Sequence, residues 1–218
     1  MRKLQFFCDF DGTAASRDVG QQLFVEFGDL PTCEAAVSAW MRGQISSAEM
    51  YRRECQTLRI TPKALEQFAM RQKLDEHFPA FVHHCHQAGD ELFIVSDGFA
   101  AYIRLILNHY ALNNLTLLAN DINLNDHTKL EPVFPYLKHS CGACANCKGY
   151  HVRKHRRPGT TVVYIGDGFS DRCGAKEADI IFAKHDLAAF CKSENIPFIH
   201  FSNFADVLQQ IEKIRCAA

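Results

Sequence analysis

Three short apolar stretches of this chain each stop abruptly at polar residues, and this recurring pattern constrains the fold more than any other feature. The stretches are LQFFCDFDGT (4–13), ELFIVSDG (91–98) and TVVYIGDGFSD (161–171). Apolar runs of this length that end at turn residues are typical of buried strands. The segments between them carry apolar residues at helical spacing. Strands that alternate with helices favour a mostly parallel, Rossmann-like α/β sheet. Ligands bind at the carboxyl ends of such strands, so the three polar clusters are predicted to converge.

The rest of the chain continues this alternation, apart from one segment. Helices are expected near 77–87, 99–110, 148–157, 186–193 and 204–214, and further strands at 180–183 and 198–201. Residues 115–136 alternate apolar and polar letters around Asn123, Asn125 and Asp126, which indicates short strands and a hairpin. Residues 35–41, 47–58 and 62–70 are helical with no strand among them. We therefore expect a core formed by 1–15 and 74–218, with a small all-helical cap at 16–73.

Composition excludes several classes of function. The chain has 218 residues and a formal net charge of −1, which gives no overall attraction to nucleic acid or to an anionic membrane. The basic run at 153–157 lacks interleaved aromatic residues and is interpreted as a solvated helix face. No stretch approaches the roughly 18 apolar residues of a membrane span, and the first apolar run is too short for a signal peptide. A cytoplasmic protein with ten reduced cysteines is expected, binding neither membrane nor nucleic acid.

The carboxylates at the strand ends point to metal and phosphate chemistry. Asp9 and Asp11 lean to the same side of an extended backbone, and such a pair repels unless a cation or a proton lies between them. A single D-x-D is commonly a solvated turn, but Asp167 and Asp171 are expected beside this one. Oxygen ligands with room for water favour Mg²⁺ over zinc. Ser96 and a lysine can hold a phosphate that such a cation attracts.

DFDGT, the strand ending in serine, a later lysine and GDGFSD resemble, in order, the four motifs of the haloacid dehalogenase superfamily of phosphatases. The resemblance implies a covalent aspartyl-phosphate formed on Asp9. It implies that Asp11 is the general acid and base. The remaining implied roles are Mg²⁺ ligation by Asp9, the backbone carbonyl of Asp11, and Asp167, supported by Asp171, and phosphoryl binding by Ser96 with Asp97 and Gly98.

Three lysines, Lys138, Lys148 and Lys154, precede the GDGFSD stretch. Lys148 opens a predicted helix directly after a cysteine run, as the lysine of the third family motif does. We therefore assign the catalytic lysine to Lys148.

The helical insert resembles the cap of the phosphoserine phosphatase-like subclass. That resemblance implies that Asp18 faces the substrate, although Asp18 also suits the N-terminus of a helix. The adjacent Arg17 is the alternative, as a residue that binds a substrate anion. The nearest resemblance is to the phosphatases of methionine salvage that act on 2-hydroxy-3-keto-5-methylthiopentenyl-1-phosphate, and to their relatives that act on phosphoethanolamine or phosphocholine; phosphoserine is a further alternative. A small phosphate ester is the implied partner, and monomer and homodimer both remain open.

The segment HSCGACANCK places His139, Cys141, Cys144 and Cys147 in an H-x-C-x₂-C-x₂-C pattern. Four soft ligands can hold a structural Zn²⁺. The alternative is a loop of reduced thiols packed behind Lys148.

Rival functions also follow from particular residues. A phosphotransferase or a phosphonatase can use the same scaffold, and a phosphonatase needs a Schiff-base lysine, for which Lys63 is the candidate within the cap. A zinc-bearing binding module on a degenerate phosphatase fold is the rival that is not an enzyme. The intact acidic set argues against degeneration.

Overall fold

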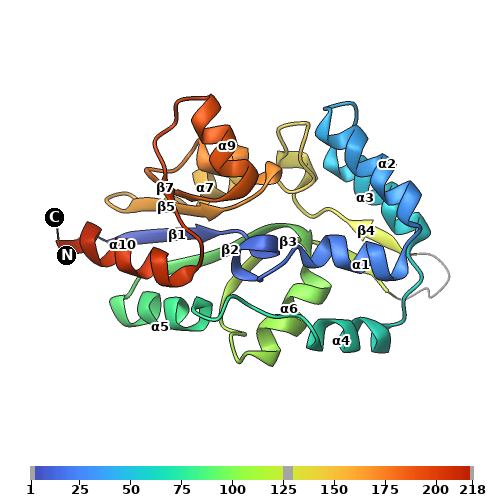
Figure 1. Cartoon of the computed structure of the whole chain (residues 1–218), viewed down its shortest axis with the longest axis horizontal. Helices are drawn as coiled ribbons and strands as arrows, with labels where there is room; N and C mark the ends of the chain where they lie inside the picture. Colours follow the sequence, from blue (N-terminus) through green and yellow to red (C-terminus); the bar gives the residue numbers. More distant parts are fainter. Residues whose placement is uncertain (1–2, 125–129, 217–218) are drawn as a thin grey trace.

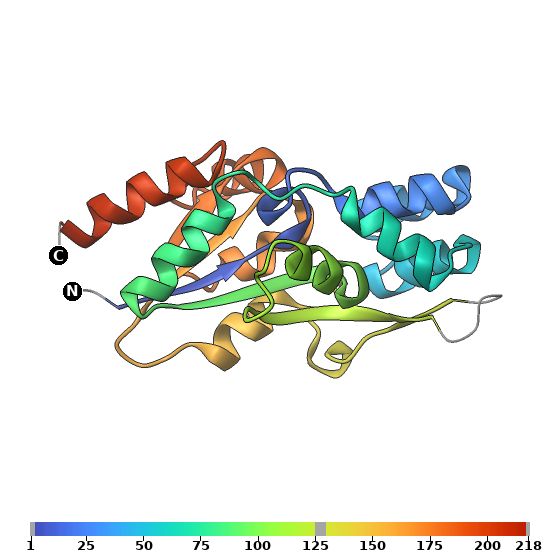
Figure 2. The ribbon, with the colours of Figure 1, turned by 90° about the horizontal axis from the view of Figure 1, so that it is seen from below.

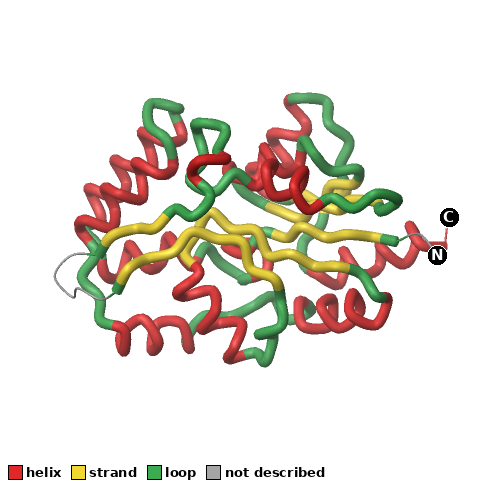
Figure 3. The backbone as a smooth tube through the Cα atoms, turned by 180° about the vertical axis from the view of Figure 1, so that it is seen from behind, coloured by secondary structure: helices red, strands yellow, loops and turns green. Residues whose placement is uncertain are grey.

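The computed structural model describes residues 3–124 and 130–216. Its centre is a seven-stranded sheet in the order β4-β3-β2-β1-β5-β6-β7, parallel except for β4, which pairs antiparallel with β3. Figure 3 shows this sheet between layers of helices. The predicted α/β class is confirmed. The strands are β1 Leu4–Cys8, β2 Glu91–Phe99, β3 Thr116–Asn123, β4 Glu131–Val133, β5 Thr161–Gly166, β6 Ile180–Ala183 and β7 Ile199–His200.

Helices cover both faces of the sheet. In Figure 1, α5, α6 and α10 lie on one face, and α7 and α9 lie on the other. These helices are α5 Phe78–Ala88, α6 Ala100–His109, α7 Lys148–His155, α9 His185–Ser193 and α10 Phe204–Cys216, with the short α8 Arg172–Ala175 after β5. Among the described residues, no helix has both the length and the apolar character needed to cross a membrane.

The strands are apolar on both sides because both faces are covered. In β1, Phe6 packs edge-on against Phe81 of α5, with ring centroids 5.2 Å apart. The next residue, Phe7, points to the opposite face and stacks on Phe93 of β2 at 5.0 Å. The continuous apolar run of β1 therefore serves two separate cores, and it fixes this strand in the middle of the sheet.

Four further helices, α1 Val19–Phe27, α2 Leu30–Met41, α3 Ser47–Thr57 and α4 Pro62–Met70, follow β1. Figures 1 and 2 place them at the end of the molecule away from the two termini. The chain leaves and re-enters the core side by side: Ser16 N donates to Lys73 O and Asp75 N donates to Ala14 O, each at 2.9 Å. The two chain segments that connect these helices to the sheet therefore run side by side; we call this place the paired crossing.

Local sequence explains where these helices begin. The side chains of Ser46 and Thr61 accept the N–H three residues on, as N-caps do, and both starts agree with the predicted ones. The predicted start of α2 near residue 35 was too late. Asp29 caps this helix and Pro31 lies in its first turn, where a missing N–H is tolerated, so the helix begins at Leu30.

Differences elsewhere are small. β2 runs to Phe99 rather than Val95, and β7 contains only Ile199 and His200. The expected hairpin is present as β3 and β4, with Asn123 opposite Glu131. Its expected turn residues Asn125 and Asp126 lie outside the described residues.

Candidate active site

The three strands that end in polar residues are neighbours in the sheet, in the order β2-β1-β5. Because they are parallel, their carboxyl ends meet at one edge, where Asp9 follows β1, Ser96 lies in β2 and Asp167 follows β5. The backbone N–H of Asp9 donates to Ile165 O at 2.9 Å, which extends the β1–β5 pairing to the site itself. The predicted convergence is therefore present.

The turn after β1 depends on Gly12. Its φ is +73°, and a Cβ at this position would lie 2.5 Å from Asp167 Oδ2. The neighbouring Thr13 donates its hydroxyl to Asp167 Oδ1 at 2.8 Å. Any other residue at 12 would be strained and would also displace Asp167, so the glycine sets the distance between the β1 and β5 carboxylates.

Lys148, the first residue of α7, is the lysine that reaches the acids. Its Nζ lies 2.6 Å from Asp9 Oδ1 and 2.6 Å from Asp171 Oδ1, and the side chain is 1% exposed. Lys138 and Lys154 are exposed, and Lys154 lies over the ring of Tyr150. Burial alone would lower the pKa of Lys148, but the charges of Asp171 and Asp9 outweigh it and raise the pKa. The lysine therefore stays charged between two carboxylates.

Asp171 is fully buried, and both of its carboxylate oxygens accept hydrogen bonds. Besides Lys148, it accepts hydrogen bonds from the Tyr164 hydroxyl at 2.7 Å and from the backbone N–H groups of Gly168 and Asp167 at 2.8 and 3.0 Å. Asp171 thus anchors both the lysine and the GDGFSD turn.

Asp9, Asp167 and Asp171 form a group whose carboxylate oxygens lie within 4.8 Å of one another. Burial, and then the charge of Asp171, raises the pKa of Asp9 well above its ordinary value and that of Asp167 to about 6. Crowded oxygen donors whose ionised forms are disfavoured suit a hard divalent cation that offsets their repulsion. This donor set fits Mg²⁺.

Asp11 has different surroundings. Its carboxylate accepts from the Tyr102 hydroxyl at 2.9 Å, from the Ser96 hydroxyl at 3.1 Å and from the Gly20 N–H at 3.1 Å. Burial, and then the charge of Asp18, raises its pKa to about 7. A carboxyl group that titrates near neutral pH can both give and take a proton. Tyr102, in the first turn of α6, was not predicted.

The two residues that follow Ser96, Asp97 and Gly98, make different contacts. The Gly98 N–H donates to Ser96 Oγ at 2.9 Å. Asp97, which was predicted to bind substrate, is buried and is among the residues that line the cavity at this site. Its Oδ1 also accepts from Asn146 N at 2.8 Å and from Asn120 Nδ2 at 3.1 Å. These contacts tie the loop before Lys148 to the end of β2.

A cavity of about 730 Å³ lies between these acids and the helices α1, α2 and α3. Asp9, Asp11, Ser96 and Asp167 line it from the sheet. Its lining from the helices combines apolar groups with acids and one arginine, among them Val25, Leu30, Met41, Arg42, Asp18 and Glu54. This volume falls within the range of small-molecule sites.

The predicted specificity residues differ in position. Asp18 lines the cavity, and its Oδ1 also caps α1 by accepting from Gln21 N at 2.8 Å, so both readings of Asp18 are compatible with the structure. Arg17 is exposed and is not among the cavity-lining residues; its backbone carbonyl instead accepts the Gly12 N–H at 3.0 Å. Lys63 is likewise exposed and outside the lining.

Glu54 of α3 was not predicted. It is 3% exposed and lines the cavity, and its Oε2 has no hydrogen-bond partner among the described residues. Burial, and then the charge of Asp18, raises the pKa of Glu54 to about 8. A buried carboxyl oxygen without a partner is a costly feature that a bound ligand can satisfy.

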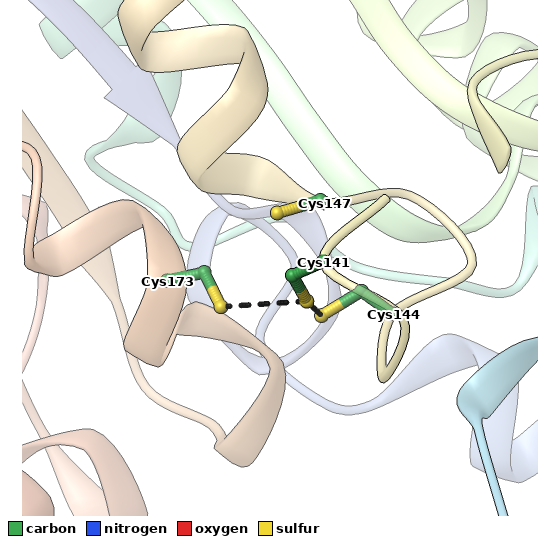
Figure 4. A group of neighbouring side chains, drawn as sticks. All are labelled: Cys141, Cys144, Cys147 and Cys173. Atoms are coloured by element: carbon green, nitrogen blue, oxygen red, sulfur yellow. Dashed lines mark hydrogen bonds between the residues drawn. The ribbon is translucent and has the colours of Figure 1, made fainter. Parts of the chain in front are cut away.

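The cysteine loop corrects the predicted zinc ligands. Cys141, Cys144 and Cys147 come together, but their fourth neighbour is Cys173 of α8, not His139 (Figure 4). The ring of His139 stacks on Tyr150, with centroids 4.5 Å apart. The loop folds toward α8 and leaves His139 on the side of α7.

The basic run at the end of α7 is paired with acids. Arg153 contacts Glu177 and Arg156 contacts Asp179, each at 2.5 Å, and Arg157 contacts Glu91. These pairs offset the charges of the three arginines.

Comparisons with known proteins agree with this geometry. The haloacid dehalogenase-like hydrolase family matches residues 6–176. A 2-hydroxy-3-keto-5-methylthiopentenyl-1-phosphate phosphatase of Brevibacillus brevis is 27% identical, over 98% of this chain and 97% of its own length. Pdp3-interacting factor 1 of Schizosaccharomyces pombe is also 27% identical, over 98% and 96%.

Among solved structures, a phospho-aspartyl intermediate analogue of phosphoserine phosphatase superposes with a TM-score of 0.73 at 19% identity, over 96% of this chain and 98% of that one. At that identity the likeness concerns the fold. The family match spans most of the chain and contains Asp9, Asp11, Ser96, Lys148, Asp167 and Asp171, and this chain belongs to the haloacid dehalogenase-like hydrolases.

Proposed function

We propose that this hydrolase is a Mg²⁺-dependent phosphomonoesterase that acts on a small phosphorylated metabolite through an aspartyl-phosphate. The observation that carries the proposal is that two carboxylates at one cavity have different partners. Asp9 accepts from Lys148 at 2.6 Å and lies beside Asp167 and Asp171, where a bound Mg²⁺ would offset the repulsion that raises the pKa of Asp9. Asp11 accepts from the neutral hydroxyl groups of Ser96 and Tyr102 and has a pKa of about 7. A carboxylate held by cations suits the nucleophile, and a carboxyl group that titrates near neutral pH suits the acid and base.

The reaction proceeds in two displacements. An oxygen of Asp9 attacks phosphorus, the bond from phosphorus to the ester oxygen breaks, and Asp11 gives its proton to the departing alkoxide. Asp11, now ionised, takes a proton from a water molecule whose oxygen attacks the aspartyl-phosphate. The bond between phosphorus and Asp9 then breaks, inorganic phosphate leaves, and both carboxyl groups regain their starting states.

Asp9 and Asp167 are the proposed metal ligands, together with the backbone carbonyl of Asp11, and Asp171 supports them. Bound Mg²⁺ supplies positive charge that attracts the phosphate and balances the charge that develops on it. Lys148 contributes a fixed positive charge beside Asp9. Ser96, freed from its hydrogen bond to Asp11, donates to the transferred phosphoryl group together with the Gly98 N–H.

We also propose that residues 16–73 act as a substrate-selecting cap over the core of 1–15 and 74–218. The paired crossing at Ala15 and Leu74 supports this division, because both connections pass the same point. Cap residues form the side of the cavity that faces away from the sheet. Discrimination between phosphate esters must come from groups that touch the leaving alcohol, and the cap supplies them.

The lining favours 2-hydroxy-3-keto-5-methylthiopentenyl-1-phosphate as substrate. Its hydroxyl and keto groups match the free carboxyl oxygen of Glu54 and the nearby Asp18. Its methylthio end matches Val25, Leu30 and Met41, apolar cavity residues that are 53%, 42% and 48% exposed. Relatives at 27% identity that carry this substrate in their name support the choice.

Phosphoethanolamine is the second candidate. Its ammonium group would be stabilised by ionised Glu54 and Asp18. Phosphoserine is less favoured, because its carboxylate would lie beside the same acids, and Arg17 is outside the cavity lining. The phosphonatase alternative is disfavoured in the same way, since Lys63 does not line the cavity.

A panel of phosphorylated metabolites tests the proposal, with phosphate release measured in Mg²⁺ and again after chelation. The methylthio enol phosphate should give the highest kcat/KM, followed by phosphoethanolamine. Asp18→Ala should raise KM for the preferred metabolite far more than for an aryl phosphate, which does not use that contact. Absence of phosphate release from every ester would support the binding-module alternative, and faster hydrolysis of phosphoproteins than of every small ester would refute the proposed role of the cap.

A further inference from the structure

We propose that Cys141, Cys144, Cys147 and Cys173 bind a structural Zn²⁺ that holds the catalytic Lys148 and Asp171 in register. The four sulfurs lie within 4.8 Å of one another (Figure 4). This group is separate from the Asp9–Asp167–Asp171 group and has a different chemistry. Thiolates select soft or borderline metals, whereas the carboxylates select a hard one.

The sulfur spacing suits a tetrahedral ion. With zinc–sulfur bonds of about 2.3 Å, the edge of a regular tetrahedron is about 3.8 Å. Cys141 Sγ lies 3.5 Å from Cys144 Sγ and 3.9 Å from Cys173 Sγ. A disulfide would join only two of the four sulfurs, at about 2.0 Å, and would leave the other two thiols unpaired. A single ion at the centre uses all four.

Two parts of the chain build the group. The loop of 140–147 is folded on itself: the Ser140 hydroxyl accepts from the Gly142 N–H at 3.1 Å and donates to the Cys144 carbonyl. The fourth cysteine arrives because α7 and α8 pack closely. A Cβ on Gly149 of α7 would lie 2.5 Å from the Cys173 carbonyl, so only glycine permits this approach.

The group lies directly behind the catalytic ion pair. Cys147 is the residue before Lys148, and Cys173 is two residues after Asp171. The Lys148–Asp171 pair is buried and must keep its 2.6 Å contact without help from water. A metal that joins the two segments just behind this pair would fix the separation of their backbones.

The same loop also contacts the cap. The Ser47 N–H at the start of α3 donates to the Ala143 carbonyl at 2.9 Å, and the Ser47 hydroxyl accepts the Ala145 N–H at 2.6 Å. Ser47 is fully buried. An ion in this loop would therefore stabilise three things together: the lysine, the GDGFSD turn and the base of α3.

Metal analysis tests the site on the full chain. Protein purified without chelator should contain about one zinc per chain, as a closed four-thiolate site does. Cys173→Ser and Cys144→Ser should each remove most of this zinc. His139→Ala and Cys216→Ser are the matched controls and should retain it, because His139 stacks on Tyr150 and Cys216 is exposed at the end of α10.

Two measurements on the wild-type protein keep the proposal testable if a serine variant fails to fold. Replacement of zinc by Co²⁺ should give the intense thiolate-to-cobalt absorption of a tetrahedral site. Removal of zinc should lower the thermal midpoint, whereas removal of Mg²⁺ should abolish turnover with a much smaller change in that midpoint. Wild-type protein without zinc, a mass deficit of two hydrogens that reveals a disulfide, or zinc that depends on His139 and not on Cys173 would each overturn the proposal.

Discussion

The sheet and the cap contribute polar groups to the same cavity, but the two sets differ in how far the protein itself satisfies them. On the sheet side, the carboxylates of Asp9, Asp11 and Asp167 all accept hydrogen bonds from buried donors. On the cap side, Asp18 accepts the Gln21 N–H, but Glu54 Oε2 is buried and has no partner among the described residues. Under the proposed function, the groups that perform the chemistry are fixed before the substrate arrives, and Glu54, the proposed selecting group, is satisfied only by the substrate.

This comparison predicts large effects from substitutions on the sheet side and selective ones from the cap side. Asp9→Asn keeps the shape of the side chain but removes the proposed nucleophile and one charge from the proposed metal site. Turnover should fall by at least about 10⁴-fold, as when other covalent nucleophiles are removed. Steady-state phosphate release measures the loss, and circular dichroism checks that the fold is retained. Asp29→Asn is the matched control, because asparagine caps α2 equally well. Near-normal turnover in Asp9→Asn would refute the covalent mechanism.

Asp11→Asn should have a smaller effect that depends on the leaving group. The amide cannot protonate an alkoxide, so alkyl phosphates should lose about 10²- to 10⁴-fold in kcat, the usual contribution of general acid–base catalysis. An aryl phosphate, whose leaving group needs little protonation, should lose less. Parallel kcat measurements on both esters make the test. Equal losses would indicate that Asp11 only positions the phosphate.

A third substitution changes the pKa of Asp11 and leaves the residue itself in place. The Tyr102 hydroxyl donates to the Asp11 carboxylate at 2.9 Å and so favours its ionised form. Tyr102→Phe should therefore raise the pKa of Asp11 above about 7. In the proposed mechanism the protonated form of Asp11 is the active acid, so kcat/KM should fall as pH rises through this pKa, and the basic limb of the profile should move to higher pH. Tyr110→Phe, at the end of the same helix, should leave that limb in place. A shift to lower pH would contradict the assigned role.

Sequence reasoning succeeded where a local pattern carried the information. The buried strands at 4–8, 91–95 and 161–165 were predictable because both faces of a parallel sheet are covered, which makes these runs continuously apolar. Their polar ends then had to converge, and the structure brings Asp9, Ser96 and Asp167 together at one edge. The choice of Lys148 depended on its place at a helix start, and its 2.6 Å contact with Asp9 agrees with that choice.

The residues that were missed depend on tertiary contacts that no local pattern encodes. Tyr102 has the helical spacing of a core residue, and only the approach of α6 to the β1 turn brings its hydroxyl to Asp11. Cys173 lies 32 residues from Cys141 and is isolated in sequence. A signal was present nonetheless, because Cys173 closely follows the GDGFSD strand end that converges with Lys148. His139 was preferred only because it was near in the chain.

The smallest predicted effect is also the sharpest test of the cap. With a pKa of about 8, Glu54 is largely protonated at pH 7 and can exchange hydrogen bonds with a neutral hydroxyl or keto group. Glutamine has a similar shape and is neutral as well. Glu54→Gln should therefore leave KM for the methylthio enol phosphate almost unchanged at pH 7, whereas Glu54→Ala should raise it about tenfold, the value of one buried hydrogen bond. Glu66→Ala, on the exposed face of α4, is the control.

Phosphoethanolamine reverses this expectation, because its ammonium group favours the ionised carboxylate and lowers the pKa of Glu54 on binding. Glu54→Gln should then raise KM nearly as much as Glu54→Ala does, and KM of the wild-type enzyme should fall as pH rises from 6 toward 8. The glutamine variant thus separates the two candidate substrates by charge. If Glu54→Ala leaves KM unchanged for both esters, the unsatisfied oxygen of the cap does not meet the substrate, and the contrast between cap and sheet fails at this residue.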